Sequence, residues 1–171
     1  KLYDINSENL KKGEQTILKN LQRMVNKEKI TESDLEKTVV NIKYTTDFDS
    51  ILNADLVIEV VSENLELKKS IFKELDLKCP KNTIIASNTS SISITKLAEE
   101  TTRKDKVIGM HFMNPVPIMK LVEIINSKYT SKETTDIVLT LSEQLGKIPL
   151  VVNDFPGFIS NRILMPMINE A

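Results

Sequence analysis

The sequence predicts an α/β fold built on a doubly wound, mostly parallel sheet. Short β-branched runs alternate with stretches whose apolar residues recur at helical spacing, which is typical of successive βαβ units. The run at 55–61 (DLVIEVV) has almost no polar face, as expected of a parallel strand that is covered on both sides. With 171 residues, the chain is long enough for one well-packed domain and too short for two large ones.

The first half of the chain begins with a short β-like piece at 1–4 that ends in Asp4. Helical spacing of apolar residues follows from Leu10, and Thr31 with Asp34 resembles the cap of a second, shorter helix. Alternation predicts a strand at 41–48, and the buried strand at 55–61 comes next. An apolar stripe over 67–75 then predicts a helix that leads into a buried strand at 83–87.

The second half continues the alternation. A helix is expected around 94–100, strands at 107–112 and 121–125, and a last strand at 150–152. Thr130 and Glu133 have the spacing of a capping box, and they open a helix that Gly146 closes. A final helix is expected over 158–171, where Pro166 should kink it. No linker interrupts 1–156, so we expect one domain there and the start of a second part at 157–171.

Charge and composition exclude several classes of protein. The 23 basic and 24 acidic residues nearly cancel, which disfavours a general binder of nucleic acid or of membrane surfaces. No apolar run reaches the roughly 20 residues of a membrane span, and no signal peptide is evident, so we expect a cytoplasmic protein. Cys79 and His111 are the only cysteine and histidine. We therefore expect neither a disulfide nor a metal site, and an inert thiol at Cys79.

Polar residues gather just past the carboxyl ends of the predicted strands, where open α/β sheets bind their ligands. They are Asp4, the segments 62–64 and 87–91, His111 and Asn114. Each also has a structural interpretation. Asp4 suits the ribose hydroxyls of a dinucleotide, but also the positive end of a helix dipole. The hydroxyls of 87–91 suit a ligand, but also a turn that caps the next helix.

His111 is the side chain best suited to proton transfer near neutral pH, and Glu123 lies within the apolar run LVEII. A buried carboxylate needs a partner, and a His–Glu pair would orient the imidazole for general base catalysis. Alternatively, His111 is a structural histidine, and Glu123 faces solvent or pairs with Lys120. Asn161, one turn past Gly157, either lies on a polar helix face or directs its amide into the crevice.

Three segments carry a resemblance to a known family: IIASNTSSISIT, VIGMHFMNPVPIMKLVEII and PGFISNRILMPMINEA. They resemble the L-3-hydroxyacyl-CoA dehydrogenases, most of all the bacterial 3-hydroxybutyryl-CoA dehydrogenases. The resemblance covers essentially the whole chain and is weakest at 6–53. It implies a Rossmann-like NAD-binding domain over 1–156 and the first helix of an all-α domain over 157–171. The implied reaction is the NAD-dependent oxidation of L-3-hydroxyacyl-CoA to 3-ketoacyl-CoA, or the reverse reduction of acetoacetyl-CoA.

The resemblance also implies a role for each matching residue. His111 corresponds to the catalytic base and Glu123 to the carboxylate that holds it. Ser90 and Asn161 correspond to residues that hydrogen-bond the reacting oxygens of the substrate. Cofactor-binding residues implied in the same way are Asp4 at the ribose and Glu63, Lys68, Ser90 and Asn114 at the nicotinamide half. Lys27 and Ser90 are implied contacts of the CoA substrate.

Two departures from the family pattern shape the expectations. The family has a Gly-rich turn G-x-G-x-x-G after a first strand, and Gly13, Gly109, Gly146 and Gly157 do not form it. We therefore expect a sheet without its first strand, and poor activity from these 171 residues alone. The family also continues past Ala171 into a region that implies a homodimer at full length. Alternative hypotheses are a related dehydrogenase of free hydroxy acids or sugar acids, and a truncated, non-catalytic binding module.

Overall fold

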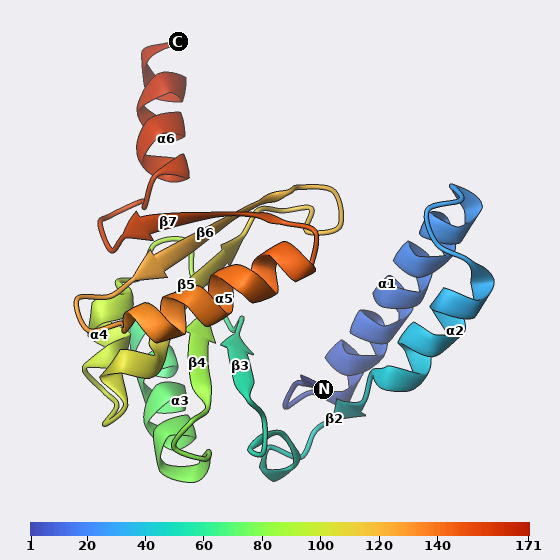
Figure 1. Ribbon diagram of the computed structural model, residues 1–171, viewed down its shortest axis with the longest axis horizontal. Coiled ribbons are helices and arrows are strands. Elements are labelled where there is room, and N and C mark those ends of the chain that lie inside the picture. Colours follow the sequence, from blue (N-terminus) through green and yellow to red (C-terminus); the bar gives the residue numbers. More distant parts are fainter. The chain divides into compact units, whose positions relative to one another are not determined.

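The computed structural model describes residues 1–171, which form two compact units, 1–53 and 54–171 (Figure 1). No helix in either unit has the length and apolar character needed to cross a membrane. Unit 54–171 contains most of the predicted site residues and is a mixed α/β sheet structure.

Unit 1–53 is a small parallel βαβ-like unit. Strand β1 (Leu2–Tyr3) leads into α1 (Ser7–Asn26) and α2 (Glu32–Asn41), and β2 (Tyr44–Thr45) returns to pair in parallel with β1. A 3-10 turn, Asp49–Ile51, follows. The strand predicted at 41–48 is much shorter than expected because α2 extends to Asn41.

The predicted cap of the second helix is confirmed. Thr31 Oγ1 accepts a hydrogen bond from the backbone N–H of Asp34 at 3.1 Å, and the Asp34 carboxylate accepts one from the N–H of Thr31 at 3.0 Å. These two bonds satisfy donors that the first turn of a helix leaves free.

Unit 54–171 is built on a five-stranded sheet in the order β3-β4-β5-β6-β7, so that β3 forms one edge. All neighbouring strands are parallel except β5 and β6, which confirms the mostly parallel sheet. The strands are β3 (Leu56–Glu59), β4 (Ile84–Ser87), β5 (Val107–Phe112), β6 (Leu121–Asn126) and β7 (Ile148–Asn153). The helices are α3 (Leu65–Lys78), α4 (Ile94–Ala98), α5 (Lys132–Gln144) and α6 (Ser160–Glu170), with a 3-10 turn at Lys104–Lys106.

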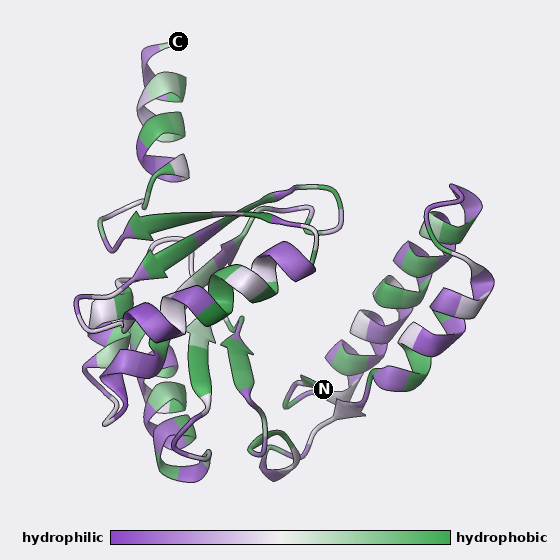
Figure 2. Ribbon diagram, in the orientation of Figure 1, coloured by the Kyte–Doolittle hydropathy of each residue, from purple (hydrophilic) through white to green (hydrophobic).

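The two faces of this sheet have different roles. Alternate strand residues pack with Val138 of α5 on one face, in a core of Ile84, Ala86, Ile108, Met110, Val122 and Ile124. Hydrophobic residues dominate the strands, whereas α5 carries both kinds of residue (Figure 2). The intervening strand residues, which include Ser87, Gly109, His111 and Glu123, therefore lie on the opposite face, toward α4.

Gly109 makes close packing possible on that opposite face. A Cβ built at this position would lie 2.8 Å from Ile125 Cβ and 3.0 Å from Ile94 Cγ1. We expect Gly109→Ala to lower the free energy of unfolding by about 1–3 kcal/mol, because neither isoleucine can withdraw from a packed core. Urea denaturation measures this, with Gly13→Ala in α1 as the control. At Gly13 a Cβ meets only a Leu2 methyl group, at 3.3 Å. An equal loss in both variants would contradict the prediction.

The ends of the last two helices differ in part from expectation. Ser131, and not Thr130 with Glu133, caps α5 by accepting the N–H of Thr134 at 3.1 Å. Thr130 instead donates its hydroxyl to the carbonyl of Val107 at 2.6 Å. Gly146 does close α5, in the left-handed conformation with φ +71°. Helix α6 continues through Pro166, which lies inside it.

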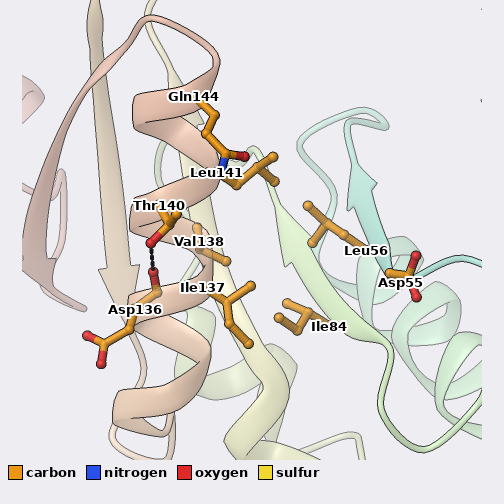
Figure 3. Close-up of a pocket in the computed structure, with 9 residues that line it drawn as sticks. All are labelled: Asp55, Leu56, Ile84, Asp136, Ile137, Val138, Thr140, Leu141 and Gln144. Carbon is orange, nitrogen blue, oxygen red and sulfur yellow. Dashed lines mark hydrogen bonds between the residues drawn. The ribbon is translucent and has the colours of Figure 1, made fainter.

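An open apolar groove runs between edge strand β3 and α5 (Figure 3). Leu56 and Ile84 of the sheet face Ile137 and Leu141 of the helix across it. Because Ile84 belongs to the α5 face, this groove lies on the other side of the sheet from His111 and takes no part in the polar cluster described next.

Candidate active site

The antiparallel register of β5 and β6 places His111 directly opposite Glu123. Side chains of opposed residues lie on the same face of a sheet, so the imidazole and the carboxylate meet. Their closest atoms, His111 Nδ1 and Glu123 Oε2, are 2.8 Å apart. Glu123 is completely buried and His111 is 9% exposed. Glu123 therefore neither faces solvent nor pairs with Lys120.

The second oxygen of Glu123 is held by the start of α6. Oε1 accepts hydrogen bonds from the backbone N–H groups of Ile159 and Ser160, at 3.0 and 2.8 Å, and from Ser160 Oγ at 3.0 Å. Burial alone would raise the pKa of Glu123, but the hydrogen bonds from His111 and Ser160 outweigh burial and hold that pKa below its usual value. The carboxylate is therefore ionised at neutral pH.

An ionised carboxylate can only accept hydrogen bonds, which determines the tautomer of His111. Nδ1 must carry a proton in order to donate it to Glu123, so the neutral imidazole has its free lone pair on Nε2. The Phe158 ring lies beside the imidazole, with 6.0 Å between ring centroids. This arrangement supplies an oriented nitrogen base.

The first turn of α6 also connects the second predicted pair. Asn161, next to Ser160, donates from Nδ2 to the backbone carbonyl of Ser90 at 3.3 Å. Ser90 lies in the loop after β4 and is partly exposed. The four residues with predicted catalytic roles thus come from β5, β6, the loop after β4 and α6, and the start of α6 links them.

Glu63 fixes the loop after β4, residues 88–93, which is called the serine-rich loop below. Its Oε1 accepts the backbone N–H groups of Ser90 and Ser91, at 3.0 and 3.2 Å, and the hydroxyl groups of Ser91 and Thr89. Burial opposes ionisation, but the hydrogen bonds from Thr89 and Ser91 lower the pKa of Glu63 below its usual value. The side chain remains 38% exposed, so it also reaches the surface.

Lys68 lies beneath Glu63 and is only 1% exposed. Its ammonium group donates to Glu59 Oε1 at 2.7 Å and to the carbonyl of Val61 at 3.1 Å, and Glu63 Oε2 is 3.4 Å away. The other oxygen of Glu59 accepts the Ser87 hydroxyl at 2.7 Å. Lys68 therefore has three protein partners. Polar contacts run from Ser87 through Glu59, Lys68 and Glu63 to the serine-rich loop.

Asn88 belongs to the predicted polar segment 87–91. Its Oδ1 accepts the N–H of Phe112 at 2.9 Å and so fixes the end of β5 beside His111. Sequence reasoning missed two other residues of this region. Glu59 is the buried partner of Lys68, and its signal was an acid inside an apolar strand nine residues before a lysine. Asp154 binds the start of α4 through Ser93 Oγ and the N–H groups of Ile94 and Thr95.

Comparison with known proteins identifies the family to which the chain belongs. The family described as "3-hydroxyacyl-CoA dehydrogenase, NAD binding domain" matches residues 1–155. The chain belongs to the 3-hydroxyacyl-CoA dehydrogenase family. Within that family the matched region is the NAD-binding domain.

The sequence similarity to relatives in the 3-hydroxyacyl-CoA dehydrogenase family extends along the whole chain. The chain is 48% identical over 171 residues to a probable 3-hydroxybutyryl-CoA dehydrogenase of Bacillus subtilis, covering all of this chain and 60% of that protein. It is 42% identical over 176 residues to the human mitochondrial hydroxyacyl-coenzyme A dehydrogenase, covering 99% of this chain and 56% of that protein. The chain thus spans a little over half the length of these relatives.

A solved structure of the family agrees closely with the fold. The (S)-3-hydroxybutyryl-CoA dehydrogenase from Ralstonia eutropha superimposes with a TM-score of 0.95 at 50% identity. The match covers 98% of this chain and 59% of that one. The predicted Rossmann-like α/β class is therefore confirmed.

The residues predicted for NAD lie in both units. Asp4 follows β1, and its carboxylate accepts the N–H of Asn6 at 2.8 Å while remaining partly exposed. A partly exposed carboxylate after a parallel strand has the acceptor oxygens that ribose hydroxyls need. Lys27 is exposed just past α1, and Asn114 lies in an exposed loop after β5.

Proposed function

We propose that the protein carrying this chain is an NAD-dependent 3-hydroxyacyl-CoA dehydrogenase that interconverts 3-hydroxybutyryl-CoA and acetoacetyl-CoA. The observation that carries the proposal is the buried His111–Glu123 pair, with Nδ1 and Oε2 at 2.8 Å and Nε2 left free. Family membership and the names of the relatives, which include a 3-hydroxybutyryl-CoA dehydrogenase of Clostridioides difficile, support the substrate class.

His111 acts as the general base in this proposal. Nε2 takes the proton of the substrate's 3-hydroxyl group as a hydride leaves C3, so that the C3–O single bond becomes a carbonyl. NAD supplies the acceptor for that hydride. Glu123 stabilises the imidazolium that forms, and it keeps the ring in the tautomer that leaves Nε2 free to accept the proton. In the reverse direction the imidazolium returns the proton to the carbonyl oxygen.

Ser90 and Asn161 have the donors for the reacting oxygens. The Ser90 hydroxyl is partly exposed, and the Asn161 amide has a second N–H besides the one directed at the Ser90 carbonyl. Donors fixed at the position where negative charge develops stabilise the transition state, and Glu63 together with α6 fixes these two. Water is not needed in this step.

The remaining predicted residues are assigned to the cofactor and to CoA. We assign Asp4 to the ribose, and Glu63, Lys68 and Asn114 to the nicotinamide side. For Lys68, the buried ammonium acts by holding Glu63 and Glu59, its two carboxylate partners. The exposed Lys27 ammonium suits a phosphate of CoA.

A substrate panel tests the proposed class. The protein carrying this chain, supplied with NADH, should reduce acetoacetyl-CoA with a kcat/KM at least about 100-fold above that for free acetoacetate, because remote CoA contacts contribute to transition-state binding. A preference for the free acid would favour a dehydrogenase of hydroxy acids. No turnover of either compound, in protein that is shown to be folded, would favour a non-catalytic binding module.

A further inference from the structure

We propose that Ser160 is a positioning residue for the His111–Glu123 pair: its hydroxyl group, with the two N–H groups beside it, holds Glu123 in one orientation and thereby directs the imidazole. The proposal rests on the proposed function, because it concerns how the base is held. It adds a residue from the first turn of α6 to those implied by the family resemblance.

The two oxygens of Glu123 are divided between two partners. Oε2 accepts a hydrogen bond from the His111 imidazole, and Oε1 receives its three hydrogen bonds from residues 159 and 160. A carboxylate held from both ends cannot rotate or slide without losing several bonds. Since Glu123 is completely buried, water cannot replace a lost donor, and each donor has a large effect.

Glu123 in turn completes the start of α6. The N-cap residue Ile159 has no side-chain acceptor, and no side-chain hydrogen bond of the usual kind caps this helix. The N–H groups at a helix start lack partners within the helix, and they favour a negative charge. The Glu123 carboxylate of β6 serves as that acceptor. The orientation of α6 and that of the base are thus coupled.

The two N–H groups belong to the backbone and remain after a substitution, whereas the Ser160 hydroxyl is present only with the right side chain. Serine and threonine carry this donor, cysteine carries a weaker one and alanine has none. Glu123 is the charged group in contact with the imidazole. Arg162 lies over the Phe155 ring, and Asp154 is bound by the start of α4. A substitution at Ser160 changes how Glu123 is held, and it therefore changes the electric field of that carboxylate at the His111 imidazole.

The NMR signals of the His111 imidazole test the proposal without any cofactor. His111 is the only histidine of the chain, so its imidazole signals are unambiguous. Loss of the hydroxyl removes one of the three donors of Glu123 Oε1, so the carboxylate and its hydrogen bond with His111 Nδ1 should change position. At one neutral pH, the signals of the Nδ1 proton and of the ring nitrogens should therefore move in Ser160→Ala. Ser160→Thr should restore their positions, and Ser160→Cys should give intermediate positions.

A matched control separates positioning from stability. Ser131→Ala removes a serine hydroxyl from the start of another helix, α5, and should lower the melting temperature without moving the imidazole signals of His111. In the NADH-dependent assay, Ser160→Ala should lower kcat/KM for acetoacetyl-CoA about three- to tenfold and leave KM for NADH unchanged.

The outcomes separate this proposal from the proposed function. Unchanged imidazole signals in Ser160→Ala, or a failure of Ser160→Thr to restore them, would overturn the role of Ser160 even if His111 proves catalytic. A fully active His111→Gln variant would remove the proposed function, while shifted imidazole signals in Ser160→Ala would still show that Ser160 sets the environment of the imidazole.

Discussion

Replacing His111 with Gln should lower kcat for acetoacetyl-CoA reduction by about 10²- to 10⁴-fold, the usual contribution of a general acid or base. Glutamine keeps a polar group at the position but cannot exchange a proton near neutral pH. Steady-state kinetics measure the loss, and NADH binding, followed by fluorescence, should change little. A variant with near wild-type kcat would exclude His111 as the proton-transfer group.

Glu123→Gln should give a comparable loss for a different reason. The amide oxygen of Gln can still accept the donors of α6, which leaves its NH₂ group facing His111 Nδ1. Nδ1 must then accept a hydrogen bond, so the proton moves to Nε2 and the base is lost. Glu99→Gln, a surface carboxylate paired with Lys128, is the control and should retain full activity. Equal activity of both variants would contradict this account.

Lys68→Met should have the largest effect on stability. It leaves Glu59, which is buried, without the ammonium group at 2.7 Å, and we expect the free energy of unfolding to fall by about 3–5 kcal/mol. Lys73→Ala removes an exposed lysine of the same helix from its pair with Glu100 and should cost at most about 1 kcal/mol. Urea denaturation compares the two variants.

A double variant identifies the cause of the Lys68 effect. In Glu59→Gln/Lys68→Met no unpaired charge is buried, so much of the lost stability should return. If the double variant were no more stable than Lys68→Met, the loss would come from packing and not from the uncompensated carboxylate.

The order of strands and helices could be predicted because periodicity is a local property of the sequence. The His111–Glu123 pair could be predicted for a similar reason, since both residues lie in recognisable strands that are close together in the sequence. The predicted Ser90 and Asn161 positions depended on the family resemblance, and the structure brings them within a hydrogen bond of 3.3 Å between Asn161 Nδ2 and the Ser90 carbonyl.

The strand predicted at 41–48 is shortened by the adjacent helix α2, whereas the other misses depend on contacts between distant segments. Two adjacent hydroxyl residues, Thr130 and Ser131, could each have capped α5. The choice follows from the bond of Thr130 to Val107, 23 residues earlier. Likewise, the partners of Glu59 and the donors from Ser160 become visible only when the sheet and α6 are placed together.

Hydride transfer itself is the most direct test of the central claim. The protein carrying this chain is incubated with acetoacetyl-CoA and NADH that carries deuterium at both C4 positions of the nicotinamide. The wild-type and His111→Gln proteins are run side by side, and the products are analysed by mass spectrometry. We expect 3-hydroxybutyryl-CoA with one deuterium at C3 from the wild-type protein and almost none from the variant. Unlabelled product, or equal labelled product from both proteins, would contradict the account.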